Sequence, residues 1–284
     1  MNVSNTVNLP PSGYEYCVNG RSRPFFQSNP FAFNIYMSNG NIALKEGQAY
    51  RVVLRNIQFQ NLIPNINSYN NSFSFIFNGT TYTFILAISN YTVTSFLTAI
   101  NTALAGVNAG LQIAYDTNAK LITLFIPASS TFQWNRGTVT TSIVDNRQYL
   151  QAPYDRFLAL IGFIDNARAG TINTTTTASS IVGTSPLNLY GTSWIDVTLN
   201  TQLNCVHMQP LGRQILVRIP VLVDYGQIIR FDPTYAISFT MDYSALGSMQ
   251  MTCYDEWGSM IKDAPFDTPF QMQLLLIPLN QGND

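Results

Sequence analysis

The sequence predicts an all-β protein: a single jelly-roll β-sandwich that carries an inserted, mostly-β domain with one helix. Short segments of alternating apolar and polar residues recur along the chain, each bounded by Gly, Pro, Asp or Asn. Eight such segments remain when Phe31 to Phe59 is joined to Trp194 to Ile277, and a jelly roll has eight strands. The expected divisions are an N-terminal arm (1–29), the jelly roll (30–62 and 188–284) and the inserted domain (63–187).

The chain begins with a polar segment, which two predicted strands follow. Pro10-Pro11, Gly13 and Gly20 give residues 1–29 the composition of an extended arm that orders against a neighbour. Alternation from Phe31 to Ile35 predicts a short strand, and Tyr50 to Phe59 predicts a longer one.

The middle of the chain opens with a hairpin. Two alternating strands, 73–77 and 82–86, flank Asn78-Gly79, the residues that a tight turn with positive φ requires. Apolar residues at helical spacing between Val93 and Leu104 predict the one helix, with Thr92 as its cap and Gly106 ending it in the left-handed conformation.

Two further strands, 111–115 and 121–126, are expected around a turn at 116–119. Residues 165–186 are rich in Thr, Ser and Gly, and predict a domain crossing or a long surface excursion. Strands follow at 194–199, 235–241, 249–254 and 270–277. Between them, residues 212–233 indicate a strand pair with a turn at Asp224-Tyr225-Gly226.

Charge is sparse: Asp, Glu, Lys and Arg make up 10% of residues, against about 25% in a typical soluble domain. A surface of Asn, Gln, Ser and Thr has little self-repulsion and permits assembly of many copies, although an ordinary neutral monomer fits equally well. The net charge of −1 and the absence of a basic run argue against direct nucleic-acid binding. No signal peptide and no membrane span are expected.

Few residues suggest chemistry. Cys17, Cys205 and Cys253 form no paired spacing, which argues against a disulfide framework and favours a reducing compartment. Cys205 and His207 lie on one side of a strand, but a zinc or nucleophilic site needs further ligands, with only Cys253 or a nearby Asp on offer. Polar residues at a strand end are the favoured interpretation, and no metal or cofactor is expected.

An acidic cluster suggests a second candidate. Asp255, Glu256, Asp263 and Asp267 would suit acid/base work on a glycan, yet Asp before Gly, Pro or Thr is also common in turns, and the turn is favoured. The three tryptophans would suit a sugar-stacking platform, but a core role is favoured for most aromatic residues; they are Trp134, Trp194 and Trp257. The common nucleotide, nucleophile and CxxC motifs are absent, so no catalytic residue is expected.

The chain contains, in this order, the segments NLIPNINSYNN, YTFILAISNYTVTSFLTAINTAL, LQIAYDTNAKLITLFI, FLALIGF, NLYGTSWIDVTLNTQL, QILVRIPVLVDYGQIIRFDP, MTCYDEWGSMI and FQMQLLLIPL. Their order resembles the penton or minor capsid proteins of virophages, polinton-like viruses and related large double-stranded DNA viruses, over about residues 30 to 278. The resemblance implies a single jelly roll with an additional domain in many members, assembled as a pentamer at the vertices of an icosahedral shell.

The resemblance also places individual segments. Ile215–Pro220 and Tyr225-Gly226 match a strand-turn-strand signature, Leu160–Phe163 the end of the insertion, and Asp255–Gly258 the turn before the last strand. None of these positions is catalytic in that family, and the N-terminal arm matches nothing in it.

The sequence therefore favours a non-enzymatic capsid vertex protein, a homopentamer in the virion that contacts the major capsid protein and is assembled in an infected host cell. Two alternatives stay open. One is a glycan-binding β-sandwich for receptor attachment, and the other is a glycoside-active β enzyme that uses Asp255, Glu256 or Asp263.

Overall fold

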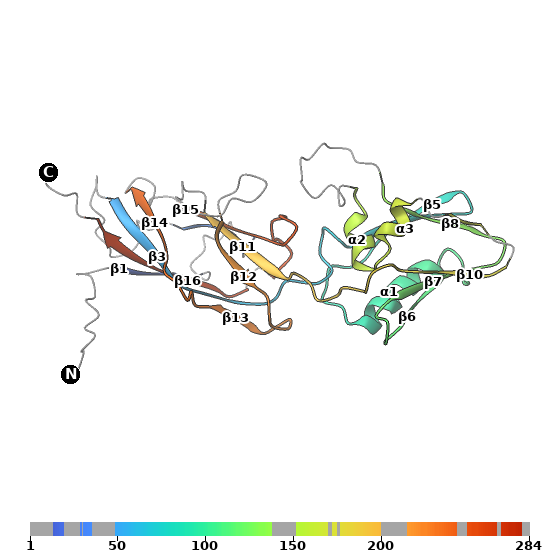
Figure 1. The fold of residues 1–284 in the computed structure, drawn as a ribbon, viewed down its shortest axis with the longest axis horizontal. Coiled ribbons are helices and arrows are strands. Elements are labelled where there is room, and N and C mark those ends of the chain that lie inside the picture. The colour runs from blue at the N-terminus through green and yellow to red at the C-terminus, as the bar shows by residue number, and fades with distance from the viewer. Residues whose placement is uncertain are drawn as a thin grey trace, which may run out of the picture. The chain divides into compact units, whose positions relative to one another are not determined.

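A computed structural model describes residues 14–19, 29, 31–35, 49–137, 152–169, 172–174, 177–199, 215–242, 249–265 and 268–279. The chain divides into two compact units, shown in Figure 1. The jelly-roll unit comprises residues 1–62 and 192–284, and the inserted unit comprises residues 63–191. The chain therefore passes from one unit to the other twice.

The described part of the jelly-roll unit contains two antiparallel sheets, in the orders β1-β16-β3-β13 and β12-β11-β15-β2, with β14 also paired to β3. The two partners of β3 on this edge, β13 and β14, pair with residues 57–60 and 49–54 and so share one strand position. The strands are β1 (Tyr14–Asn19), β2 (Ala32–Ile35), β3 (Ala49–Gln60), β11 (Trp194–Leu199), β12 (Ile215–Pro220), β13 (Ile228–Phe231), β14 (Ile237–Asp242), β15 (Met249–Tyr254) and β16 (Phe270–Pro278).

Eight strand positions in two four-position sheets, with the chain crossing repeatedly between them, make a jelly roll, which confirms the predicted fold class. The insertion lies between β3 and β11, one strand of each sheet. Strict alternation along β16 buries every second residue, and Phe270 stacks on Phe59 of β3 with ring centroids 5.7 Å apart. Phe31 closes the cluster edge-on to Phe59 at 5.5 Å.

Two expectations about this unit are wrong. The strand pair predicted over 212–233 does not form, because β12 pairs with β11 in one sheet and β13 pairs with β3 in the other. The connection between them, residues 221–227, is longer than a tight hairpin allows and carries the chain across the sandwich. The arm predicted over 1–29 contains β1, which pairs with β16 along its whole length; neighbouring Pro and Gly residues hid this short strand.

The inserted unit combines two sheets and three described helices. A four-stranded sheet has the order β5-β4-β8-β9 and a three-stranded sheet the order β10-β7-β6. The elements are β4 (Ser72–Phe77), β5 (Thr80–Ile85), α1 (Val93–Ala105), β6 (Gln112–Tyr115), β7 (Ile122–Ile126), β8 (Thr131–Asn135), α2 (Asp155–Leu160), α3 (Ile164–Arg168), β9 (Ile172–Thr174) and β10 (Ser179–Val182).

Several local predictions hold here. The β4–β5 hairpin turns at Asn78 and Gly79, whose φ angles are 48° and 76°. Thr92 caps α1 by accepting a hydrogen bond from the Ser95 N–H. The turn between β6 and β7 is held by Asp116, whose carboxylate accepts the Asn118 and Ala119 N–H groups at 2.7 and 3.0 Å.

Other details differ from the prediction. Helix α1 ends at Ala105, but Gly106 has a right-handed φ of −62° and so does not make the expected left-handed cap. Helices α2 and α3 were not predicted, because each is too short to show a helical period. Residues 165–186 contain most of α3 together with β9 and β10, and so are no crossing between domains.

Asn65 joins the two ends of the inserted unit. The residue is 5% exposed, and its Nδ2 donates to the carbonyl oxygens of Tyr91 (2.8 Å) and Leu189 (2.9 Å). Its Oδ1 accepts the Tyr91 N–H at 2.8 Å. One buried amide therefore ties the first residues of the unit to its last ones.

Candidate functional site

Asp255, the first member of the acidic cluster, holds a turn. Asp255 is 6% exposed, and its Oδ1 accepts the backbone N–H groups of Trp257 (3.0 Å) and Ser259 (2.7 Å). Glu256 accepts the Ser193 N–H at 3.2 Å. Asp255 thus satisfies backbone donors in the turn after β15, which confirms the turn interpretation for Asp255, and Glu256 satisfies a donor just before β11.

The remaining members of the predicted sites are dispersed or not described. Asp267, Cys205 and His207 lie outside the described residues. Cys253 is fully buried in β15, and burial raises the pKa of its thiol, so it stays protonated. The described residues contain no group of three His, Cys, Asp or Glu side chains that could hold a metal ion.

The tryptophans do not share one environment. Trp134 is 2% exposed and packs against Phe132 (5.0 Å) and Phe163 (5.3 Å) between ring centroids, which confirms its core role. The guanidinium of Arg218 lies 4.9 Å from the Trp194 ring centroid.

Arg218 also fixes the register of the second sheet. It lies directly opposite Asp196 across β11 and β12, and forms a two-pronged pair with Nε–Oδ1 and Nη2–Oδ2 distances of 2.7 and 2.9 Å. Its hydrogen bond to the buried Asp196 carboxylate raises the pKa of Arg218. The one charged residue of the ILVRIP segment is thus a structural partner, and its pairing explains why it interrupts an apolar strand.

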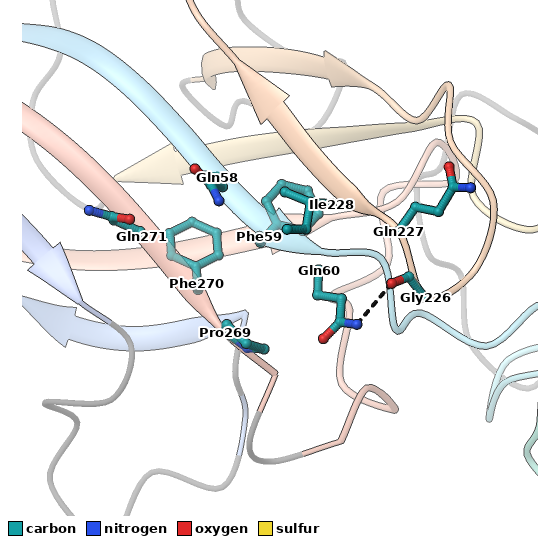
Figure 2. A pocket seen from close by; sticks show the side chains of 9 residues that line it. All are labelled: Gln58, Phe59, Gln60, Gly226, Gln227, Ile228, Pro269, Phe270 and Gln271. Carbon is teal, nitrogen blue, oxygen red and sulfur yellow. Dashed lines mark hydrogen bonds between the residues drawn. The ribbon is translucent and has the colours of Figure 1, made fainter.

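A groove of about 590 Å³ spans the neighbouring ends of β16, β3 and β13 in the first sheet (Figure 2). Its described lining combines neutral amide side chains, one glycine and apolar residues. The lining residues are Gln58, Phe59, Gln60, Gly226, Gln227, Ile228, Pro269, Phe270 and Gln271.

Hydrogen bonds from the end of β3 hold the turn beside this groove. Gln227 donates its N–H to the Asp224 carbonyl, and Gly226 has a φ of +89°, as the third position of a type II turn requires. Asn61, at the end of β3, accepts the Gly226 N–H at 2.7 Å and donates its N–H to Gln227 at 2.8 Å. Gln60 Nε2 donates to the Gly226 carbonyl at 2.8 Å, the dashed line of Figure 2.

Large apolar side chains are exposed along the same segment. Leu222, Tyr225, Ile228 and Tyr235 are 84%, 42%, 59% and 85% exposed. Arg230, between them in sequence, pairs with Asp232 at 2.8 Å, so its charge is locally balanced. We call residues 221–235 together with the groove the β13 edge. Exposed apolar side chains among neutral hydrogen-bonding groups are the composition of a protein-contact surface.

Sequence reasoning predicted a strand pair over residues 212–233 but did not identify which of its residues are exposed. The adjacent pair Ile228-Ile229 held the signal, since neighbouring strand residues face opposite sides. The structure buries Ile229 (4% exposed) and leaves Ile228 outside.

No protein-family model and no curated protein matches the chain. The solved structures that resemble it along most of its length include the following two. The mavirus penton protein has a TM-score of 0.48 and 12% identity, and the alignment covers 94% of this chain and 99% of that one. A chain of the Sputnik virophage structure has a TM-score of 0.42 and 15% identity, covering 94% and 98%. Among the described residues, no helix is long and apolar enough to cross a membrane.

Proposed function

We propose that this protein is a non-enzymatic structural protein of a virion, which forms the pentameric vertex of an icosahedral capsid. The observation that carries the proposal is a jelly roll, a fold of viral shells and also of lectins, that exposes an apolar and amide-lined β13 edge. The order of sequence segments that resembles penton and minor capsid proteins supports the same role.

The β13 edge suits contact between copies. Five copies close around an axis only through a heterologous contact, in which two different surfaces of the same protein meet. Apolar side chains supply the association energy, and neutral amides add hydrogen bonds without the desolvation cost of buried charges. The major capsid protein is the partner proposed for the remaining surface, in a virion assembled in an infected host cell.

Native mass spectrometry of the purified full chain tests the proposal. We expect a mass that contains five-copy rings, and we expect Ile228→Asp to break the rings, because it places a charge in an apolar contact. Tyr190→Asp is the matched control: Tyr190 is 96% exposed in the inserted unit, and its replacement should leave the rings intact. A folded chain that stays monomeric at high concentration would refute the pentamer. Rings of five that survive Ile228→Asp would refute the assignment of the ring contact to the β13 edge.

The groove also favours a second candidate function, glycan binding. Gln58, Gln60 and Gln271 offer neutral donors and acceptors that suit sugar hydroxyls, and the neighbouring Tyr225 offers an exposed ring. In a glycan array, Gln58→Leu would abolish binding at this groove, whereas Trp134→Phe in the inserted core would not.

A further inference from the structure

The β5 strand is an unprotected sheet edge. It is six residues long, pairs with β4 through an unbroken register, and no other described strand pairs with it. Natural sheets blunt their edges with charged side chains, proline or bulges. None of these devices is present in β5, and residues 56–115 contain no Asp, Glu, Lys or Arg at all.

The backbone groups at this edge can be assigned. Leu86 donates its N–H to the Asn71 carbonyl at 2.7 Å, so it belongs to a hydrogen-bonded pair. Hydrogen-bonded and non-hydrogen-bonded pairs alternate along an antiparallel ladder. The N–H and C=O groups of Thr81, Thr83 and Ile85 therefore point away from β4. All three residues are exposed, and Ile85 is 75% exposed.

The outward-pointing N–H and C=O groups of β5 can pair with those of β5 in a second copy of the protein. An antiparallel pair of β5 strands centred on Thr83 places Thr83 opposite Thr83 and Thr81 opposite Ile85. This register joins outward-pointing groups only and forms about six backbone hydrogen bonds.

The side chains match as well. The same register places Tyr82 opposite Phe84 of the second copy, at the non-hydrogen-bonded positions where side chains lie closest. Aromatic pairs and Thr–Thr pairs are favourable cross-strand neighbours. No charge within β5 opposes the contact.

We infer that two copies of this protein pair through their β5 strands about a twofold axis, which joins two four-stranded sheets into one continuous sheet. The contact is isologous, so it joins copies in twos and closes no ring by itself. It does not depend on the proposed function, because the ring contact is assigned to the β13 edge of the other unit.

Thr83→Lys tests the pairing, because it places two lysines directly opposite each other. It leaves the backbone hydrogen bonds to β4 intact and removes the hydrogen bond that Thr83 Oγ1 donates to Ser74 Oγ at 3.2 Å. Native mass spectrometry of the full chain should show a variant assembly with half the copies of the wild-type assembly. Thr94→Lys, the same change at an exposed residue of α1, should leave the number of copies unchanged.

Charge complementation provides a second readout. Thr83→Glu alone should also halve the mass, and a 1:1 mixture of Thr83→Lys and Thr83→Glu should restore the wild-type number of copies. Equal masses for folded wild type and Thr83→Lys would overturn the inference, and so would a mixture that stays halved. Two variants separate the two proposals. Ile228→Asp disrupts only the ring contact, so pairs of copies should remain. Thr83→Lys disrupts only the β5 contact, so rings of five should remain.

Discussion

Replacing Asp155 with Asn tests the buried ion pair that fixes α2 to the end of β8. The Asp155 carboxylate is fully buried and accepts hydrogen bonds from Arg136 Nε and Nη2, both at 2.7 Å, and from the Ala152 N–H at 3.2 Å. The hydrogen bond to Asp155 also raises the pKa of Arg136. The substitution keeps the shape of the side chain and removes its charge, which leaves the guanidinium without its counter-ion.

The expected cost follows from burial. Removing one partner of a buried pair costs about 3 to 5 kcal/mol. The Arg136 side chain is 30% exposed, so water partly solvates it, and we expect about 3 kcal/mol, the lower end of that range. An unfolding entropy of about 2.1 cal/mol/K per residue over about 130 residues gives about 0.27 kcal/mol/K for the inserted unit. The unit should therefore melt about 11 °C lower.

Scanning calorimetry of the full chain measures this shift. Asp165→Asn is the matched control, because Asp165 lies in the same unit but forms an exposed pair with Arg168 at 3.7 Å, and we expect it to cost less than about 0.5 kcal/mol. The double variant Arg136→Met/Asp155→Leu should be more stable than Asp155→Asn, since it leaves no unpaired charge. If Asp155→Asn has the same melting temperature as the Asp165→Asn control, the assignment of the pair as a stabilising contact is refuted.

Three further predictions concern single residues. Gly162→Ala should destabilise the protein far more than Gly79→Ala in urea unfolding. Both glycines have a positive φ, which costs about 1 to 2 kcal/mol for Ala. Of the two, only Gly162 would place the new Cβ against a backbone oxygen, at 1.9 Å. Backbone hydrogen bonds, foremost that from Ala119, lower the pKa of Asp116. A carboxyl whose pKa is lowered in the folded state stabilises the fold at pH values above its unfolded-state pKa, and this contribution is lost as the pH falls. The difference in melting temperature between wild type and Asp116→Asn should therefore shrink below about pH 4. With the other two cysteines replaced by Ser, Cys253 should react with thiol reagents only after denaturation, because burial raises its thiol pKa; labelling of the native protein, detected by mass, would contradict its burial.

Local signals in the sequence identify much of the fold. The hairpin at Asn78-Gly79, the cap at Thr92 and the turn at Asp116 each depend on residues within a few positions of one another, so they can be read from short segments. The alternation in Phe270–Pro278 is equally local, because one face of this strand lies on the core.

What the sequence could not show is pairing between distant segments. Strands β12 and β13 follow each other closely in the chain, yet they lie in different sheets, because the partner of β13 is β3, more than 160 residues away. The pairing of the short strand β1 could not be predicted for the same reason, since its partner is the distant β16. The β13 edge was also missed. Alternation shows that one face of a strand is apolar, but it does not show which face is buried in the sandwich. Ile228, an apolar residue on the exposed face, illustrates this.

The position of Asn65 bears on the order in which the chain folds. Strands β3 and β16 must find each other across more than 200 residues, and closing so long a loop is slow. The inserted unit is contiguous in the chain, and its completion brings residues 65 and 189 within one hydrogen bond. Once it has formed, the two halves of the sandwich are separated by a short bridge instead of a long loop, so early formation of this unit would speed the assembly of everything around it.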